Sequence, residues 1–198
     1  MPRQHPLTPL EEALEAWTDA RTGLAREARN IPAARYGFRP APGTRTVAEL
    51  LRHVLEVAAM MVGELSRPDT DFHRAPWPEL LALYDQPVRR ARTKPLIVAL
   101  LGRQLRAGQR ALRQAGAAEL RRVITRFDGL KGTKLEWLHH GIAHEEYHRG
   151  QLTVYARLLG REPALTRAIR DGIWRLRGSR GSRPRASARS GRARATSI

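Results

Sequence analysis

The segment from Thr133 to Leu159 constrains the fold most, because it reads as one long amphipathic helix that ends just before Gly160. At about 100° per residue, His148 projects at about +40° and His140 at about −40° from His144. The stripe around this direction also contains Trp137, Gln151, Tyr155 and Leu158. The opposite side carries Glu146, Arg149, Thr153 and Arg157. A helix of this length must bury its apolar stripe against other elements, which predicts a helical bundle.

Three more segments have apolar residues at helical spacing, at about 8–29, 46–66 and 94–115. The first begins with Thr8-Pro9, and the second begins with the capping box Thr46-Val-Ala-Glu49. Gly116 suits the C-terminal cap of the third. A short helix is expected at about 78–88, and residues 121–127 could form a short extended segment before a turn. The sequence therefore predicts an all-α four-helix bundle in one domain, residues 1–174.

The end of the chain is strongly basic. Arg175 to Ile198 has eight arginines and no acidic residue, so it supplies eight of the formal net charge of +17 and leaves +9 for residues 1–174. Arg, Gly, Ser, Ala and Pro dominate this segment and cannot build a core, so residues 175–198 are predicted to be a disordered Arg-rich tail. Such a tail attracts polyanions, and we expect non-specific nucleic-acid contact through it at most.

The sequence also excludes several kinds of chemistry. The chain has no cysteine, which rules out disulfides, thiolate metal ligands and a cysteine nucleophile. No apolar run approaches the ~18–20 residues that span a bilayer, and residues 1–15 lack the pattern of a signal peptide. We therefore expect no membrane association and a cytoplasmic location. Any metal ligands in this chain must be His, Asp, Glu or water.

Two histidines on the long helix are candidate metal ligands. His144 and His148 are four residues apart, which brings their Cβ atoms to about 5–6 Å on a helix. Two imidazoles at that spacing can hold one ion at about 2.0–2.1 Å per nitrogen. His53 lies on the apolar face of the second predicted helix and could be a third ligand. From spacing alone, hydrogen-bonded core histidines explain the pattern about equally well.

Three further residues are candidates to support such a site. Glu56 follows His53 by one turn and could accept a hydrogen bond from an imidazole, or lie in solvent. Gln151 follows His148 by one turn and could bond a metal-bound water, or merely pack. His140 shares the inward stripe of the long helix, although by itself it would be interpreted as a core residue.

Two motifs resemble those of DinB-like proteins. One is His144-Glu-Glu-Tyr-His148-Arg-Gly-Gln-Leu on the last predicted helix. The other is Thr46-Val-Ala-Glu-Leu-Leu-Arg-His53-Val, which follows a loop with Phe38-Arg-Pro-Ala-Pro-Gly43. The order of elements is similar over about residues 8–165. The resemblance implies an up-down-down-up bundle in which His53, His144 and His148 hold one divalent ion, zinc or nickel above all, with water in open positions.

The resemblance also implies a function. Activities in the family include metal-dependent transfer to low-molecular-weight thiols and a thiol-dependent isomerisation. Because this chain has no cysteine, the thiol must come from a cosubstrate. We therefore expect a metal-dependent transferase or hydrolase, most of all one that joins a thiol to an electrophilic small molecule in stress or detoxification, with homodimers an open question. The alternative is a non-catalytic protein of DNA damage or stress that binds polyanions, its histidines serving structure.

Overall fold

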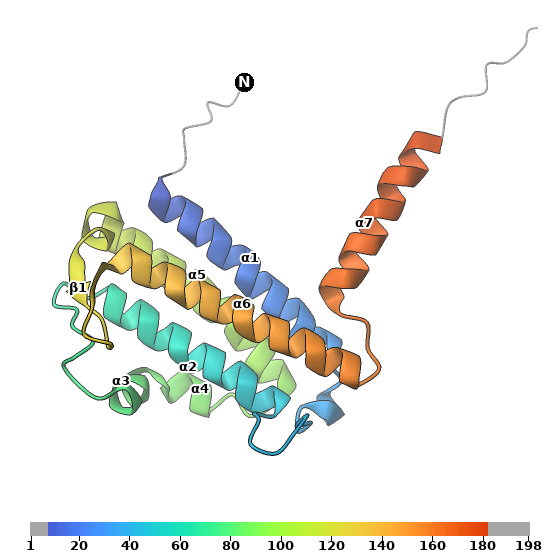
Figure 1. Cartoon of the computed structure of the whole chain (residues 1–198), viewed down its shortest axis with the longest axis horizontal. Helices are drawn as coiled ribbons and strands as arrows, with labels where there is room; N and C mark the ends of the chain where they lie inside the picture. Colours follow the sequence, from blue (N-terminus) through green and yellow to red (C-terminus); the bar gives the residue numbers. More distant parts are fainter. Residues whose placement is uncertain (1–7, 182–198) are drawn as a thin grey trace, which may run out of the picture.

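The computed structural model describes residues 8–181 and shows the predicted four-helix bundle (Figure 1). Its long helices are α1 (Pro9–Asn30), α2 (Val47–Leu65), α5 (Lys94–Leu120) and α6 (Lys134–Leu158). Helices α1 and α2 each pack against both α5 and α6. Helices α1 and α6 run in one direction, and α2 and α5 run in the other. The chain is thus an all-α, up-down-down-up bundle.

The connections explain why α2 and α5 run the same way. A single turn, η1 (Ala33–Arg35), leads into α2, whereas α3 (Trp77–Tyr84) and α4 (Gln86–Arg89) carry the chain back along the bundle. The short helix predicted at 78–88 is therefore two pieces. Pro87 explains the break, because its ring lacks a backbone N–H and is tolerated only in the first turn of a new helix.

A small hairpin joins α5 to α6. Strand β1 (Val123–Thr125) pairs antiparallel with β2 (Lys131–Thr133), so the expected extended segment at 121–127 is present in its central part. In this pairing Thr125 lies opposite Lys131 and Ile124 lies opposite Gly132. Helix α5 is longer than predicted, because helical turns resume after Gly116, whose φ of 86° places a kink there.

The predicted helix starts are correct in detail. The hydroxyl of Thr46 accepts a hydrogen bond from the Glu49 backbone N–H at 3.2 Å, and the Glu49 carboxylate accepts one from the Thr46 N–H at 2.7 Å. Thr8 caps α1 in the same way, by accepting from the Glu11 N–H at 3.2 Å. Each cap satisfies donors that a helix start leaves free, so these positions fix where α1 and α2 begin.

Helix α7 (Ala164–Gly181) was not predicted, and it extends away from the end of the bundle (Figure 1). The buried carboxylate of Glu27 accepts hydrogen bonds from the backbone N–H groups of Ala164 and Leu165, at 2.9 and 3.1 Å. The helix continues past residue 174, so residues 175–181 of the predicted tail are helical. These two hydrogen bonds satisfy donors that the start of α7 leaves free. Residues 182–198 lie outside the described part.

No helix among the described residues is long and apolar enough to cross a membrane.

Candidate metal centre

Helices α2 and α6 bring three imidazoles together. The Nε2 atom of His144 lies 3.1 Å from Nε2 of His53 and 3.0 Å from Nε2 of His148. His53 comes from α2, and the other two lie one turn apart on the face of α6 that packs against α2. Helical periodicity placed each histidine on an inward face, and the resemblance to DinB-like proteins implied that the three meet. The structure shows that α2 and α6 are neighbours, which periodicity cannot tell.

The local environment keeps these imidazoles neutral. Burial lowers the pKa of His53 to about 4, with a smaller contribution from the charge of Arg45. Burial also lowers the pKa of His144 to about 3, and the neighbouring His148, His53 and Arg45 add to the effect. The pKa of His148 is lowered by burial too, although its hydrogen bond to Gln151 acts in the opposite direction. At neutral pH each ring therefore keeps one nitrogen lone pair, the form that binds metals.

Gln151 fixes the orientation of His148. The Oε1 atom of Gln151 lies 2.8 Å from Nδ1 of His148, and because this oxygen can only accept, Nδ1 must carry the proton. The lone pair of His148 is then on Nε2, the atom that faces His144. This is how ligand histidines are usually oriented in metal sites. The role expected of Gln151 was a bond to water or simple packing, and the structure places it on an imidazole instead.

The arrangement fits a single metal ion. Nitrogen–nitrogen distances of 3.0–3.1 Å are what two imidazoles with bonds of about 2.0–2.1 Å make when they share one ion at an angle near a right angle. In the described part of the chain this is the one group of three metal-ligating side chains that converge, with all ligand atoms within 4.8 Å. Each neutral imidazole carries only one N–H, so hydrogen bonds alone do not satisfy both Nε2–Nε2 contacts of His144. Nδ1 of His144 is also buried without a hydrogen-bond partner.

Two of the other candidates do not contact the imidazoles. The side chain of His140 is 49% exposed and lies against Trp137, with ring centroids 4.9 Å apart. Leu158 on the same stripe is also exposed. Glu56 makes no hydrogen bond to a described imidazole, although burial and Asp85 raise its pKa.

An arginine-lined cavity lies beside the histidines. It measures 810 Å³, and its lining includes His53, Glu56 and Arg45. Arg52, Arg89 and Arg92 also border it, with Glu49, Trp77 and Leu81. Arg45 borders a second cavity of 450 Å³ that reaches Gln151. The sequence analysis did not single out Arg45, because Arg45 lies in a loop, where no helical period predicts the direction of a side chain.

Arg45 is held in place by its backbone. The hydroxyl of Tyr155 on α6 donates a hydrogen bond to the carbonyl of Arg45 at 3.0 Å, and Phe38 packs edge-on against the Tyr155 ring. The guanidinium is exposed and makes no ion pair with any residue that the structure describes. Its charge lowers the pKa of all three histidines, so it lies on their side of the loop. A free cation beside a cluster of neutral ligands is suited to attract an anion.

Comparisons with known proteins agree with the fold. A DinB-like protein from Bacillus subtilis is 21% identical, with a TM-score of 0.57 over 75% of this chain and 92% of that chain. A mycothiol-dependent maleylpyruvate isomerase is 17% identical, with a TM-score of 0.58 over 73% of this chain. The match covers only 61% of the isomerase. The search of curated proteins found no match. The model of the DinB family matches residues 3–177, and the chain therefore belongs to the DinB family.

Proposed function

We propose that this protein is a divalent-metal-dependent enzyme that joins a low-molecular-weight thiol to an electrophilic small molecule. The observation that carries the proposal is the convergence of the imidazoles of His53, His144 and His148, because His53 also lines an 810 Å³ cavity. Membership of the DinB family supports it. The fold similarity to a mycothiol-dependent isomerase points to the same substrate class, and zinc or nickel suits three neutral imidazoles.

The proposed chemistry divides between the ion and the chain. When bound, a divalent ion supplies Lewis-acid chemistry that makes a coordinating thiol a thiolate at neutral pH. The chain supplies the three ligands, and Gln151 keeps His148 in the tautomer that binds. Because the chain has no cysteine, it offers no thiol of its own to compete with the cosubstrate.

The arginines define the kind of cosubstrate that the cavity accepts. Arg45 and Arg52 line the cavity and make no ion pair with a described residue, whereas Arg89 is held by Asp85 at 2.7 Å. Two free guanidiniums beside the histidines favour a thiol or electrophile that carries carboxylates. Trp77 and Leu81 give the same cavity an apolar wall for the uncharged part of that molecule.

Metal analysis of the purified full-length protein tests the proposal first. We expect one divalent ion per chain in the wild type and a loss of stoichiometric metal in His144→Ala. His140→Ala is the matched control, because it removes an imidazole from the same helix outside the cluster. Full occupancy of the His144→Ala protein, or equal losses in both variants, would exclude the proposed ligands.

Activity is tested separately with a panel of small thiols and a chromogenic electrophile. The wild type should form the thioether with added zinc or nickel, and the His144→Ala variant should not. Arg45→Gln should raise the KM for a carboxylated thiol roughly tenfold, in line with ~1.5–3 kcal/mol for a hydrogen bond to a charged group. The KM for an uncharged thiol should change much less. If the metal-loaded protein turns over no thiol, the proposed enzyme activity is excluded and the non-catalytic binding protein becomes the better interpretation.

A further inference from the structure

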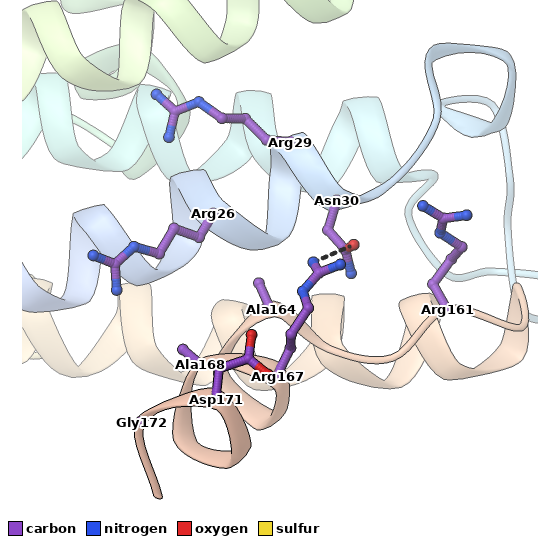
Figure 2. A pocket seen from close by; sticks show the side chains of 9 residues that line it. All are labelled: Arg26, Arg29, Asn30, Arg161, Ala164, Arg167, Ala168, Asp171 and Gly172. Atoms are coloured by element: carbon purple, nitrogen blue, oxygen red, sulfur yellow. Dashed lines mark hydrogen bonds between the residues drawn. The ribbon is translucent and has the colours of Figure 1, made fainter. Parts of the chain in front are cut away.

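A separate cavity, with none of the three histidines in its lining, lies between the C-terminal turns of α1 and the start of α7 (Figure 2). This groove measures 660 Å³ and shares no lining residue with the histidine site. Four arginines line it, Arg26 and Arg29 from α1, Arg161 from the connection, and Arg167 from α7. All four are exposed. The one acidic lining residue, Asp171, already pairs with Arg170 at 3.2 Å. The groove is therefore strongly positive.

These arginines are largely free to bind a ligand. Arg26, Arg29 and Arg161 make no ion pair among residues 8–172, whose side chains the structure describes. Arg167 donates to a neutral partner, Oδ1 of Asn30, at 2.9 Å. The Lys94 ammonium lies nearby, where it donates to the carbonyls of Arg29 and Ile31 at 2.8 and 2.6 Å. A group of cations with so few counter-charges gains most from a ligand with several negative charges.

The start of α7 is not the anion-binding element. Its first backbone N–H groups, those of Ala164 and Leu165, already donate to the buried Glu27 carboxylate. A ligand in the groove would therefore meet guanidiniums and not an open helix terminus. Guanidiniums suit phosphate in particular, because their planar fork can donate two parallel hydrogen bonds to it.

The arginines are spread along the groove and do not converge on one point. In Figure 2, Arg26 lies at one end of the lining, Arg161 lies at the other, and Arg167 lies between them. A single phosphate or carboxylate could not contact them all, whereas a chain of phosphates could. Helix α7 also leads into residues 182–198, whose sequence contains five arginines and no acidic residue.

We propose that this groove binds the phosphodiester backbone of a nucleic acid, without reading its sequence. The proposal rests on the free guanidiniums and on their spread, and it does not depend on a metal or on the proposed enzyme activity. Because backbone contacts dominate such binding, the affinity should fall steeply with salt. DNA and RNA share this phosphodiester chemistry, so the experiment below measures the affinity for each of them.

The test measures fluorescence anisotropy of the full-length protein with a labelled DNA duplex, single-stranded DNA and single-stranded RNA of equal length. The groove variant carries Arg26→Gln, Arg29→Gln and Arg161→Gln. The control variant carries Arg103→Gln, Arg106→Gln and Arg110→Gln, three exposed arginines of α5 without an ion pair to a described residue. Both variants lose the same charge and keep residues 182–198, and circular dichroism checks that both fold.

We expect the groove variant to bind duplex DNA at least tenfold more weakly at low salt. Its plot of log K against log salt should be shallower by about 2.7, since each phosphate contact contributes about 0.9 to the slope. Each single groove substitution should lower the slope by about 0.9. The control should stay within about twofold of the wild type. Equal losses in the two triple variants would assign binding to overall charge and overturn the groove, as would full binding by the groove variant.

Discussion

At the scale of single residues, the histidine site depends on a hydrogen bond from His148 to Gln151, a residue outside the three proposed ligands. Gln151 accepts from Nδ1 of His148 and so commits the Nε2 lone pair toward His53 and His144. Nδ1 of His144 has no comparable partner. The orientation of α6 imidazoles therefore rests more on Gln151 than on any other described polar side chain.

Replacing Gln151 should weaken metal binding without unfolding the bundle. Gln151→Leu removes the acceptor, so His148 can adopt the other tautomer and loses its fixed ring orientation. Loss of such a partner typically lowers metal affinity by about 10–100-fold. Competition against a chromogenic chelator measures the change. Gln151→Glu keeps an acceptor at the same place and should retain most of the affinity, and an unchanged affinity in Gln151→Leu would contradict this role.

Individual residues were predictable where a helix fixed their direction. The three histidines follow from a capping box, a period of 3.6 residues and the resemblance to a known motif. Arg45 was missed because a loop residue has no period, and its position depends on the Tyr155 hydroxyl more than a hundred positions away in sequence. His140 lies against Trp137 and not against the three imidazoles, because a helical period fixes the direction of a side chain but not the neighbour that it meets.

At the scale of elements, buried charges join helices that apolar packing alone would leave free to slide. Arg21 on α1 and Glu145 on α6 form an ion pair with 2.5 Å between Nη2 and Oε1, at 1% and 2% exposure. The indole of Trp17 donates to the same carboxylate at 2.7 Å. Glu145 directly follows His144, so this pair fixes the rotation of α6 that points the histidines at α2.

The Arg21–Glu145 pair yields a stability prediction. Glu145→Ala leaves a guanidinium and an indole N–H buried without a partner, which should lower the free energy of unfolding by about 3–5 kcal/mol. The double substitution Arg21→Met with Glu145→Leu removes both charges and should be less destabilising than Glu145→Ala alone. Denaturant unfolding of the wild type, Arg21→Met, Glu145→Leu and the double variant completes a double-mutant cycle and measures the coupling. Additive losses would show that the two side chains do not depend on each other.

Two glycines on α5, Gly108 and Gly102, allow the effect of close helix packing to be compared with the effect of helix propensity. A Cβ atom at Gly108 would lie 2.5 Å from Cη2 of Trp17 and 2.9 Å from Cγ2 of Val62. Gly108→Ala should therefore destabilise the protein by about 1–3 kcal/mol through overpacking. At Gly102 the same atom meets only the mobile Nη1 of Arg106 at 3.4 Å. Gly102→Ala should stabilise by up to about 1 kcal/mol. Thermal unfolding compares the two, and a neutral Gly108→Ala would disprove close packing of α1 on α5.

At the scale of the whole molecule, the sequence predicted the bundle but not what is attached to it. Apolar residues at helical spacing, together with caps, specified the four long helices, because each helix must bury one apolar stripe. Helix α7 escaped because its first turn is capped by Glu27, a residue from α1 that reads as part of an ordinary charged helix face. The basic groove likewise requires α1 and α7 to be side by side, and only the fold places them so.

The bundle should remain folded without a metal ion. Two clusters of buried apolar residues fill the interior, one around Leu24, Leu51 and Leu101 and the other around Leu14, Met60 and Leu112. Neutral imidazoles also do not repel each other as charged ones would. Zinc fingers, in contrast, have too small a core to fold without their ion. The free energy that holds the four helices together thus comes mainly from burial that no ion supplies.

Chelator treatment of the full-length protein at neutral pH provides the test. Helical circular dichroism should be largely unchanged, and the thermal midpoint should fall by several degrees, because a ligand at a hundred times its Kd contributes about 2.7 kcal/mol. Adding zinc or nickel back should restore the midpoint of the wild type. The midpoint of His144→Ala should not respond to either ion, since that variant lacks a central ligand. Loss of the helical signal on chelation would instead make the three histidines a structural site on which the bundle depends.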